Sequence, residues 1–252
     1  MFQLEFYLLL VSFFFIALVY SSVGFGGGSS YLALLALLNI SFDTLRPAAL
    51  LCNIVVVTSG TIIFYREGFL DFKKSWPFIL SSVPLAFLGG YYPVKQSTFF
   101  ILLAISLIVA ALLIWFQDSF QNTSAIYSRS NENLPAKIGL GGAIGLLSGM
   151  VSIGGGIFLS PILHLLRWDE AKKISALASL FILVNSVGGL AGQWLRRPTL
   201  DWGFILPLLV MVFIGGQVGS RLGAKRFNAV YIKRITALLI LIAGINILKD
   251  HW

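Results

Sequence analysis

Two glycine-rich stretches decide the fold of this chain: Tyr20-Ser21-Ser22-Val23-Gly24-Phe25-Gly26-Gly27-Gly28 and Ser148-Gly149-Met150-Val151-Ser152-Ile153-Gly154-Gly155-Gly156. Each stretch lies between two apolar runs. A glycine costs about 1 kcal/mol relative to alanine inside a helix. Three consecutive glycines in each stretch therefore predict a break between two helices.

The composition of the chain predicts that its solvent is lipid. Of 252 residues, 58% are hydrophobic and 11% charged, and the mean hydropathy is +0.90. A soluble domain has about 25% charged residues, so a soluble enzyme, a disordered chain and a disulfide scaffold (Cys52 is the one cysteine) are excluded. The excess of basic residues is scattered singly, which indicates membrane topology rather than a nucleic-acid partner.

Ten apolar stretches are candidate membrane helices: 4–24, 29–40, 47–65, 76–92, 97–117, 138–151, 155–166, 174–195, 202–220 and 231–248. One crossing needs about 20 residues, so 138–151 and 155–166 are too short to cross alone. The first stretch lacks the positive region and cleavage site of a signal peptide. We expect a first transmembrane repeat at 1–117, a polar linker at 118–137 and a second repeat at 138–252, together one transport domain.

An internal repeat is visible in the order of its matches. Gly26–Gly28 and Gly154–Gly156 are offset by 128 positions, Asn53 and Asn185 by 132. Later matches keep the order at nearly the same offset, as with Pro77 and Pro207 or Gly89-Gly90 and Gly215-Gly216. An ordered series of this kind indicates duplication.

Charge placement predicts that the two repeats are inverted. If each glycine-linked pair returns to its starting side, one face receives Arg46, Lys95, Arg196, Arg197 and Lys249, and the other receives the remaining 13 of the 18 Lys and Arg residues. If each pair is one crossing, the same 18 divide 10 to 8. The positive-inside rule favours the first arrangement. The predicted fold is all-α and polytopic, with two inverted repeats, each a glycine-broken helix pair plus three transmembrane helices, and with both termini outside.

The apolar stretches carry no chemistry of catalysis or metal binding. No carboxylate lies inside them, which argues against a proton relay or a divalent-cation carrier. His164, His251 and Cys52 are isolated, and no Ser/His/Asp cluster is present. We therefore expect no enzyme, no catalytic residue, no metal and no cofactor.

What the stretches do carry is neutral and hydrogen-bonding. A helix that restarts after a break presents free N–H groups and the positive end of its dipole, which together bind anions. Inverted-repeat transporters place such half-helices near the midplane. The predicted substrate-binding residues are Ser22, Gly26, Gly27, Gly28, Ser29, Asn53, Ser152, Gly154, Gly155, Gly156 and Asn185, and we expect a site neutral in side-chain charge.

Other features have plainer interpretations. The four-residue spacings of Gly141, Gly145, Gly149 and of Gly215, Gly219, Gly223 favour close helix packing. Packing is also the alternative for the glycine triplets, and an interhelical hydrogen bond is the alternative for Asn53 and Asn185. Arg46 next to Pro47 is typical of the start of a helix, with a charge at the mouth of the site as the alternative.

The two quoted stretches also resemble the duplicated glycine motif of the sulfite exporter TauE/SafE family, and the length, the repeat and the polar midpoint extend the resemblance over nearly the whole chain. Members of that family are membrane permeases for small sulfur-containing or organic anions. The resemblance implies that the two breaks and the surroundings of Asn53 and Asn185 line the path.

The resulting hypothesis is a transporter, an exporter by direction, for a small sulfur-containing or organic anion of the sulfite/sulfonate class. It works by alternating access at a central site formed by the two broken helices. The alternatives are a passive anion channel and a non-transporting membrane scaffold, for which a dry, packed centre would speak. The expected partners are the anion and the lipid bilayer of the bacterial inner membrane. No nucleic acid is expected, and a homo-oligomer is left open.

Overall fold

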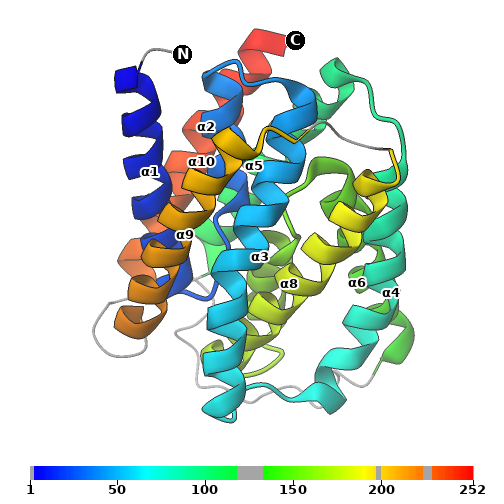
Figure 1. Ribbon diagram of the computed structural model, residues 1–252. Coiled ribbons are helices and arrows are strands. Elements are labelled where there is room, and N and C mark those ends of the chain that lie inside the picture. The colour runs from blue at the N-terminus through cyan, green and yellow to red at the C-terminus, as the bar shows by residue number, and fades with distance from the viewer. Residues whose placement is uncertain (1–2, 118–132, 197–199, 224–228, 252) are drawn as a thin grey trace.

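The computed structural model describes residues 3–117, 133–196, 200–223 and 229–251, and every regular element in these ranges is a helix. The helices are α1 Gln3–Ser22, α2 Gly28–Leu37, α3 Phe42–Arg66, α4 Phe72–Tyr91, α5 Gln96–Gln117, α6 Leu134–Val151, α7 Gly156–Leu165, α8 Ala171–Trp194, α9 Trp202–Gly223 and α10 Ala229–His251 (Figure 1). Each of the ten predicted apolar stretches coincides with one helix.

The helices fit a membrane by length and composition. Six of those described are long and apolar enough to cross it: Leu4–Ser22, Phe42–Arg66, Gln96–Phe116, Leu134–Val151, Ala171–Trp194 and Trp202–Leu222. α2 and α7, which follow the breaks, have only 10 residues each. The all-α, polytopic membrane fold is thereby confirmed.

The start of α6 differs from the prediction. The helix begins at Leu134 and has 18 residues, so the stretch that we judged too short is one of the candidate spans. Asn133 caps it by accepting from the N–H of Ala136, and Pro135 lies in the first turn, where its missing N–H costs nothing. The end of the predicted 118–137 linker is therefore helix, and 118–132 lie outside the described residues.

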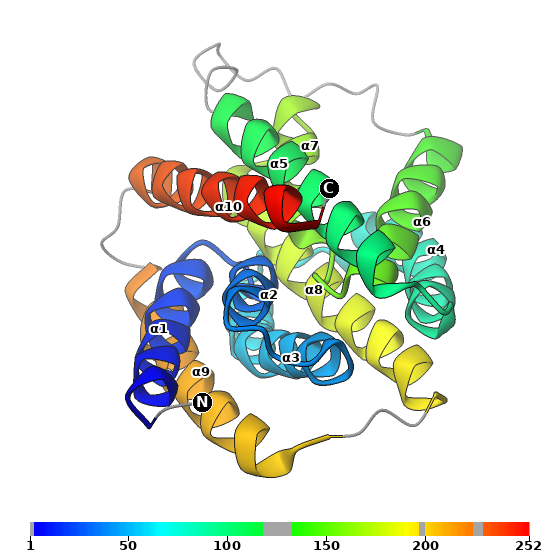
Figure 2. The ribbon, with the colours of Figure 1, turned by 90° about the horizontal axis from the view of Figure 1, so that it is seen from above.

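The helices of the two halves pack in matched pairs (Figure 2). α1 packs along α9 as α6 packs along α4, and α2 lies against α3 as α7 lies against α8. The remaining large contacts join α3 with α8, α5 with α10, α4 with α8 and α3 with α9, each pair taking one helix from either half. This is the pattern that a two-fold relation between repeats requires; the inversion of the repeats stays a prediction.

Glycines form the closest of these helix contacts. A Cβ at Gly141, Gly145 or Gly149 of α6 would overlap the backbone of α4, at Phe78, Ser82 and Ala86 respectively. A Cβ at Gly215 or Gly219 of α9 would overlap the carbonyls of Phe14 and Leu18 in α1. The predicted packing role of these five glycines is confirmed, whereas the contacts of Gly223 lie outside the described ones.

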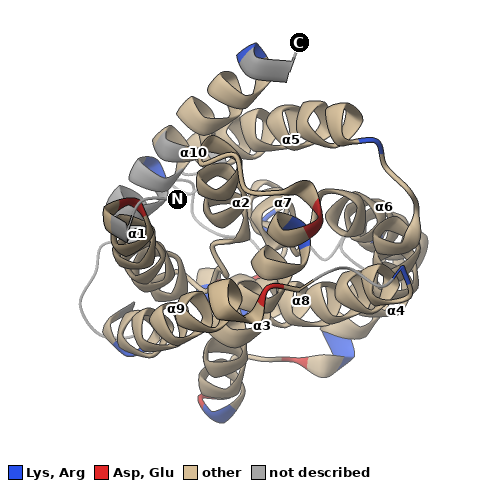
Figure 3. Ribbon diagram, turned by 45° about the horizontal axis from the view of Figure 1, so that its top comes forward, with Lys and Arg blue, Asp and Glu red and all other residues tan. Residues whose placement is uncertain are grey.

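The two ends of the molecule are distinct. The N- and C-terminal ends of the chain lie at one end, and the α3–α4 connection lies at the other (Figure 1). Lys, Arg, Asp and Glu of the described residues gather near helix ends (Figure 3). Charge is therefore concentrated away from the middle of the helix bundle, as a membrane interior requires.

Candidate functional site

Both glycine stretches interrupt a helix by turning the backbone into the left-handed region. Gly24 and Gly27 have φ of 85° and 86° between α1 and α2. Gly154 and Gly155 have φ of 88° and 82° between α6 and α7. Glycine adopts this region freely because it has no Cβ. The local sequence thus forces α2 and α7 to begin within the protein.

The two half-helices begin without a side-chain cap. Gly27 and Gly155 are the N-cap residues, and neither can supply a capping oxygen. The first N–H groups of a helix have no intrahelical carbonyl to bind. Every residue from Val23 to Ser29 and from Val151 to Pro161 is buried. Each half-helix therefore presents N–H donors and a partial positive charge to the interior.

Asn53 of α3 joins the two breaks. Its Nδ2 donates to the carbonyl of Ile153 at 2.9 Å, in the second break. In the first break, a Cβ added to Gly26 would overlap Oδ1 and one added to Gly28 would overlap Nδ2. The breaks, 128 positions apart in the sequence, therefore lie on either side of one buried amide.

Asn185 of α8 is placed differently from Asn53. Its Nδ2 donates to the carbonyl of Phe181 in its own helix at 2.8 Å, and no described contact joins it to a break. Its neighbour Ser186 takes that position, since a Cβ on Gly154 would lie 2.9 Å from Ser186 Oγ. The structure thus brings Asn53 and the glycine triplets together, and it adds Ser186, which the sequence analysis did not select for the site.

The predicted serines fall into two groups. Ser22 Oγ donates to the carbonyl of Val19 at 2.6 Å within α1, and Ser29 lies 3.4 Å from the hydroxyl of Tyr20, so both are held within the first half. Ser152, with φ of 62°, accepts hydrogen bonds from Gln193 Nε2 at 2.9 Å and from Arg46 Nε at 3.3 Å. Ser152 therefore connects the second break to a cation.

Arg46, which the sequence left between a helix start and a charge at the mouth of the site, lies beside the second break. It is only 5% exposed and donates to Ser152 and to the carbonyl of Met150. The surroundings of the second break are thus not neutral in side-chain charge, contrary to our expectation. Its position seven residues before Asn53 in one helix was a usable signal, because that spacing places two side chains on the same helical face.

Several buried polar atoms around the breaks have no protein partner. They are Tyr31 Oη, Asn53 Oδ1, Ser148 Oγ, Asn185 Oδ1, Ser186 Oγ and Gln193 Oε1. Buried polar groups in proteins are nearly always hydrogen-bonded to protein, water or a ligand. All of these side chains except Asn185 lie against a residue of one of the two breaks, so the surroundings of the uncapped helix starts are polar.

Metal ligands do not gather in the described part of the chain. No group of three or more His, Cys, Asp or Glu side chains that could hold a metal ion is found there. Cys52, next to Asn53, is buried and free of a disulfide. The chemistry of the site is thus that of amides, hydroxyls, backbone N–H groups and one guanidinium.

Comparison with known proteins supports the same class. The chain matches the family described as sulfite exporter TauE/SafE over residues 9–247. It is 30% identical over 244 residues to the probable membrane transporter protein y4hK of Sinorhizobium fredii, covering 95% of this chain and 97% of the relative. It is 27% identical to the probable membrane transporter protein YdhB of Bacillus subtilis, covering 96% and 99%. No solved structure matches the chain.

Proposed function

This chain belongs to the sulfite exporter TauE/SafE family of membrane transporters, and from that premise we propose that it moves a small sulfur-containing or organic anion of the sulfite/sulfonate class. The anion binds between the two glycine breaks, and access to it alternates between the two sides of the membrane. One half-helix start from each half supplies N–H donors to a shared centre.

The contact of Asn53 with both breaks is the observation that carries this proposal. Nδ2 is held by the carbonyl of Ile153, while Oδ1 lies against the first break. An anion that takes the N–H groups at both helix starts would have to displace or reorient this amide. Because α3 carries Asn53, binding would couple the two breaks to one long helix of the bundle.

The donor set favours a small anion with modest affinity. Backbone N–H groups and hydroxyls bind oxygen atoms of a sulfite or sulfonate group without fixing them as strongly as a salt bridge would. An inside-negative membrane potential contributes about 2.3 kcal/mol per charge per 100 mV to moving an anion outward. The electrostatics of the cell therefore favour export of such a substrate.

Reconstitution into liposomes tests the proposal. Sulfite loaded inside should leave protein-containing vesicles at a rate that saturates with concentration, and unlabelled sulfite outside should drive counterflow of labelled sulfite. Asn53→Leu, which keeps the volume and removes both polar atoms, should reduce the rate at least about tenfold, as expected for the loss of hydrogen bonds to a charged ligand.

The matched control is Ser59→Ala on the same helix. Ser59 Oγ donates to the carbonyl of Val56 within α3, so its loss should leave sulfite flux unchanged. Equal flux in wild type, Asn53→Leu and empty vesicles, for sulfite and methanesulfonate alike, would refute the proposal. Flux without counterflow, accompanied by single-channel current steps, would assign the protein to anion channels instead.

A further inference from the structure

We propose a second anion subsite next to the central one, formed by Arg46 of α3 with Ser152 of the second break and Gln193 of α8. It receives an oxyanion head group that carries one negative charge and passes it toward Asn53. This inference rests on the proposed function and adds to it the charge and geometry of the substrate group.

The guanidinium of Arg46 is held in a fixed place inside the protein. Its central carbon lies 5.2 Å from the ring centroid of Phe42 and 5.4 Å from that of Phe99, distances at which a cation and an aromatic face attract. Nε donates to Ser152 Oγ and Nη2 donates to the carbonyl of Met150, both at 3.3 Å. Residues from α3, α5 and the second break thus hold one cation.

The hydrogen bonding of this cation is incomplete. Among the described residues, Nη1 of Arg46 has no hydrogen-bond partner and no carboxylate forms an ion pair with the guanidinium. Two charges act on it from further away: Arg196 repels it and Asp43, exposed in the first turn of α3, attracts it. A largely buried charge without a paired counterion is costly, and a bound anion would supply that counterion.

The side-chain amide of Gln193, next to Ser152, also lacks one of its hydrogen-bond partners. Gln193 is 5% exposed, and its Nε2 donates to the Ser152 hydroxyl that Arg46 also binds. Its Oε1 is buried without a partner. The unpaired groups on both sides of Ser152 match a ligand that has acceptor oxygens for Arg46 and a donor, such as bound water or an acidic O–H, for Gln193.

The position of Arg46 along α3 gives the subsite its role. Arg46 and Asn53 are seven residues apart, which is about 10 Å at about 1.5 Å per helical residue. A sulfite or sulfonate group is too small to span that distance, so the two sites would be occupied in succession. A planar guanidinium binds such head groups through paired N–H···O bonds, which a lysine ammonium cannot reproduce.

A purely structural role makes a different prediction. Arg46 could serve only to bind the last carbonyls of α6, through Met150. A lysine can bind such carbonyls as well. Under that reading Arg46→Lys leaves anion binding unchanged, whereas a subsite that uses the guanidinium plane is weakened by the same substitution.

The experiment measures sulfite and methanesulfonate binding to the purified full-length protein, as thermal stabilisation against concentration, together with sulfite flux in liposomes. Arg46→Gln should raise the half-saturating concentration at least about tenfold. Arg46→Lys, which keeps the charge, should raise it several-fold. Arg66→Gln, which removes an exposed cation at the opposite end of α3, serves as the control and should change it little.

The outcomes separate this inference from the function it rests on. Unchanged half-saturation in Arg46→Lys and in any Arg46→Gln protein that is folded, with Asn53→Leu still impaired, would overturn the subsite and leave the transporter intact. Wild-type protein that neither binds nor moves sulfite or methanesulfonate would overturn both. Loss of folding in Arg46→Gln does not remove the test, because the decision then comes from Arg46→Lys.

Discussion

At the scale of single residues, Asn53 is a buried polar side chain inside an apolar helix bundle. The side chain is fully buried, and its amide N–H group is committed to the carbonyl of Ile153. That bond fixes Oδ1 as the atom without a partner. A neutral amide can take part in anion binding through Nδ2 after a small rotation, whereas a carboxylate of the same shape cannot.

Asn53→Asp tests this electrostatic argument because it keeps the shape of the side chain, replaces the N–H donor by an oxygen and adds a negative charge. We expect sulfite flux to fall more than in Asn53→Ala, because a negative charge at the junction repels the anion in addition to losing the N–H donor. The measurement is the initial rate of sulfite efflux from liposomes at pH 7. Flux in Asn53→Asp equal to or above that of Asn53→Ala would contradict an anion site at this position.

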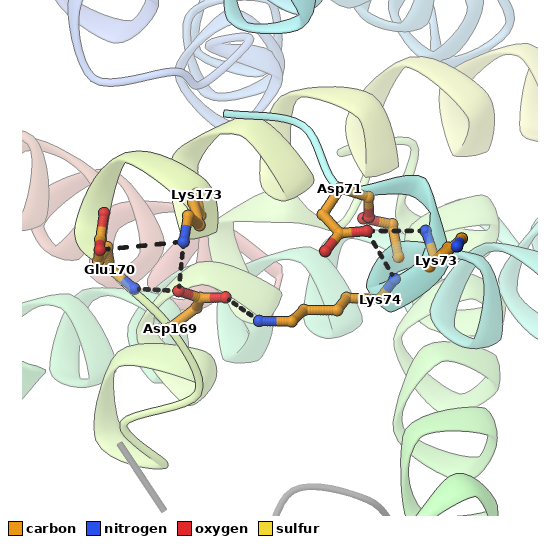
Figure 4. A network of polar contacts seen from close by, with 7 residues as sticks. Asp71, Lys73, Lys74, Asp169, Glu170 and Lys173 are labelled. Carbon is orange, nitrogen blue, oxygen red and sulfur yellow. Dashed lines mark hydrogen bonds and ion pairs between the residues drawn. The ribbon is translucent and has the colours of Figure 1, made fainter. Parts of the chain in front are cut away.

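Asp169, in the α7–α8 connection, forms ion pairs with two lysines (Figure 4). It accepts from Lys74 of α4 at 2.7 Å and lies 3.3 Å from Lys173 Nζ. Burial acts to raise the pKa of Asp169, but the hydrogen bonds from Lys74 and from the Glu170 N–H, with the charges of both lysines, outweigh it and lower the pKa from its usual value. The ion pair thus ties the two halves together at one end of the molecule.

Because the pKa of Asp169 is lowered, the contribution of its ion pairs to the stability of the folded protein depends on pH. A group whose pKa is lower in the folded state contributes stability above its unfolded pKa and loses it as pH falls through the folded value. Asp169→Asn should therefore lower the melting temperature by a constant, small amount from pH 8 to about pH 5, equivalent to roughly 0.2–1 kcal/mol for an exposed partner such as Lys74. The difference from wild type should shrink below pH 4; a difference that grows there would be inconsistent with this pKa.

At the scale of elements, the glycine seam between α4 and α6 fixes how closely the halves approach. Gly145 has the backbone of Ser82 where a side chain would be, whereas Gly139 on the same helix has open space around it. The two positions share helix, residue type and intrinsic propensity. They differ only in what the added methyl group would meet.

Gly145→Ala and Gly139→Ala should therefore change stability in opposite directions. Gly139→Ala should stabilise the folded protein by up to about 1 kcal/mol through helix propensity. Gly145→Ala should destabilise it by about 1–3 kcal/mol through forced separation of the helices. Thermal unfolding in detergent measures both, and equal shifts for the two variants would show that the seam is not tightly packed.

Most of the helices could be predicted from the sequence, but only part of the candidate site could. Hydropathy and glycine spacing are local properties, so they located the helices, both breaks and the packing role of five glycines. For Arg46 the sequence left two interpretations open, because the residue it donates to, Ser152, is distant in the chain and adopts a left-handed conformation without being a glycine. Asn185 was grouped with Asn53 by repeat position, yet the hydrogen bond it forms lies within its own helix.

At the scale of the whole molecule, the matched packing of the two halves makes a prediction about topology. The α3–α4 connection and the end of α9 lie at the end opposite the chain termini (Figure 1). Positive residues are concentrated in those regions, so the positive-inside rule places that end in the cytoplasm and both termini outside. With this placement, the repeats are predicted to be inverted relative to each other.

Cysteine labelling in intact cells measures the topology directly. In a Cys52→Ala background, single cysteines replace four exposed residues: Glu67, Arg221, Tyr92 and Arg196. An impermeant maleimide added outside should label positions 92 and 196 and spare 67 and 221. Labelling of 67 and 221 from opposite sides would contradict the inverted repeat.

The most direct measurement of the central claim is the position of a bound anion. Selenite has the shape and charge of sulfite, and its selenium atom gives an anomalous signal in crystals. The account predicts a selenium peak beside Asn53, within hydrogen-bonding distance of the N–H groups that open α2 and α7. Saturating selenite bound only elsewhere, with both helix starts filled by protein, would contradict it.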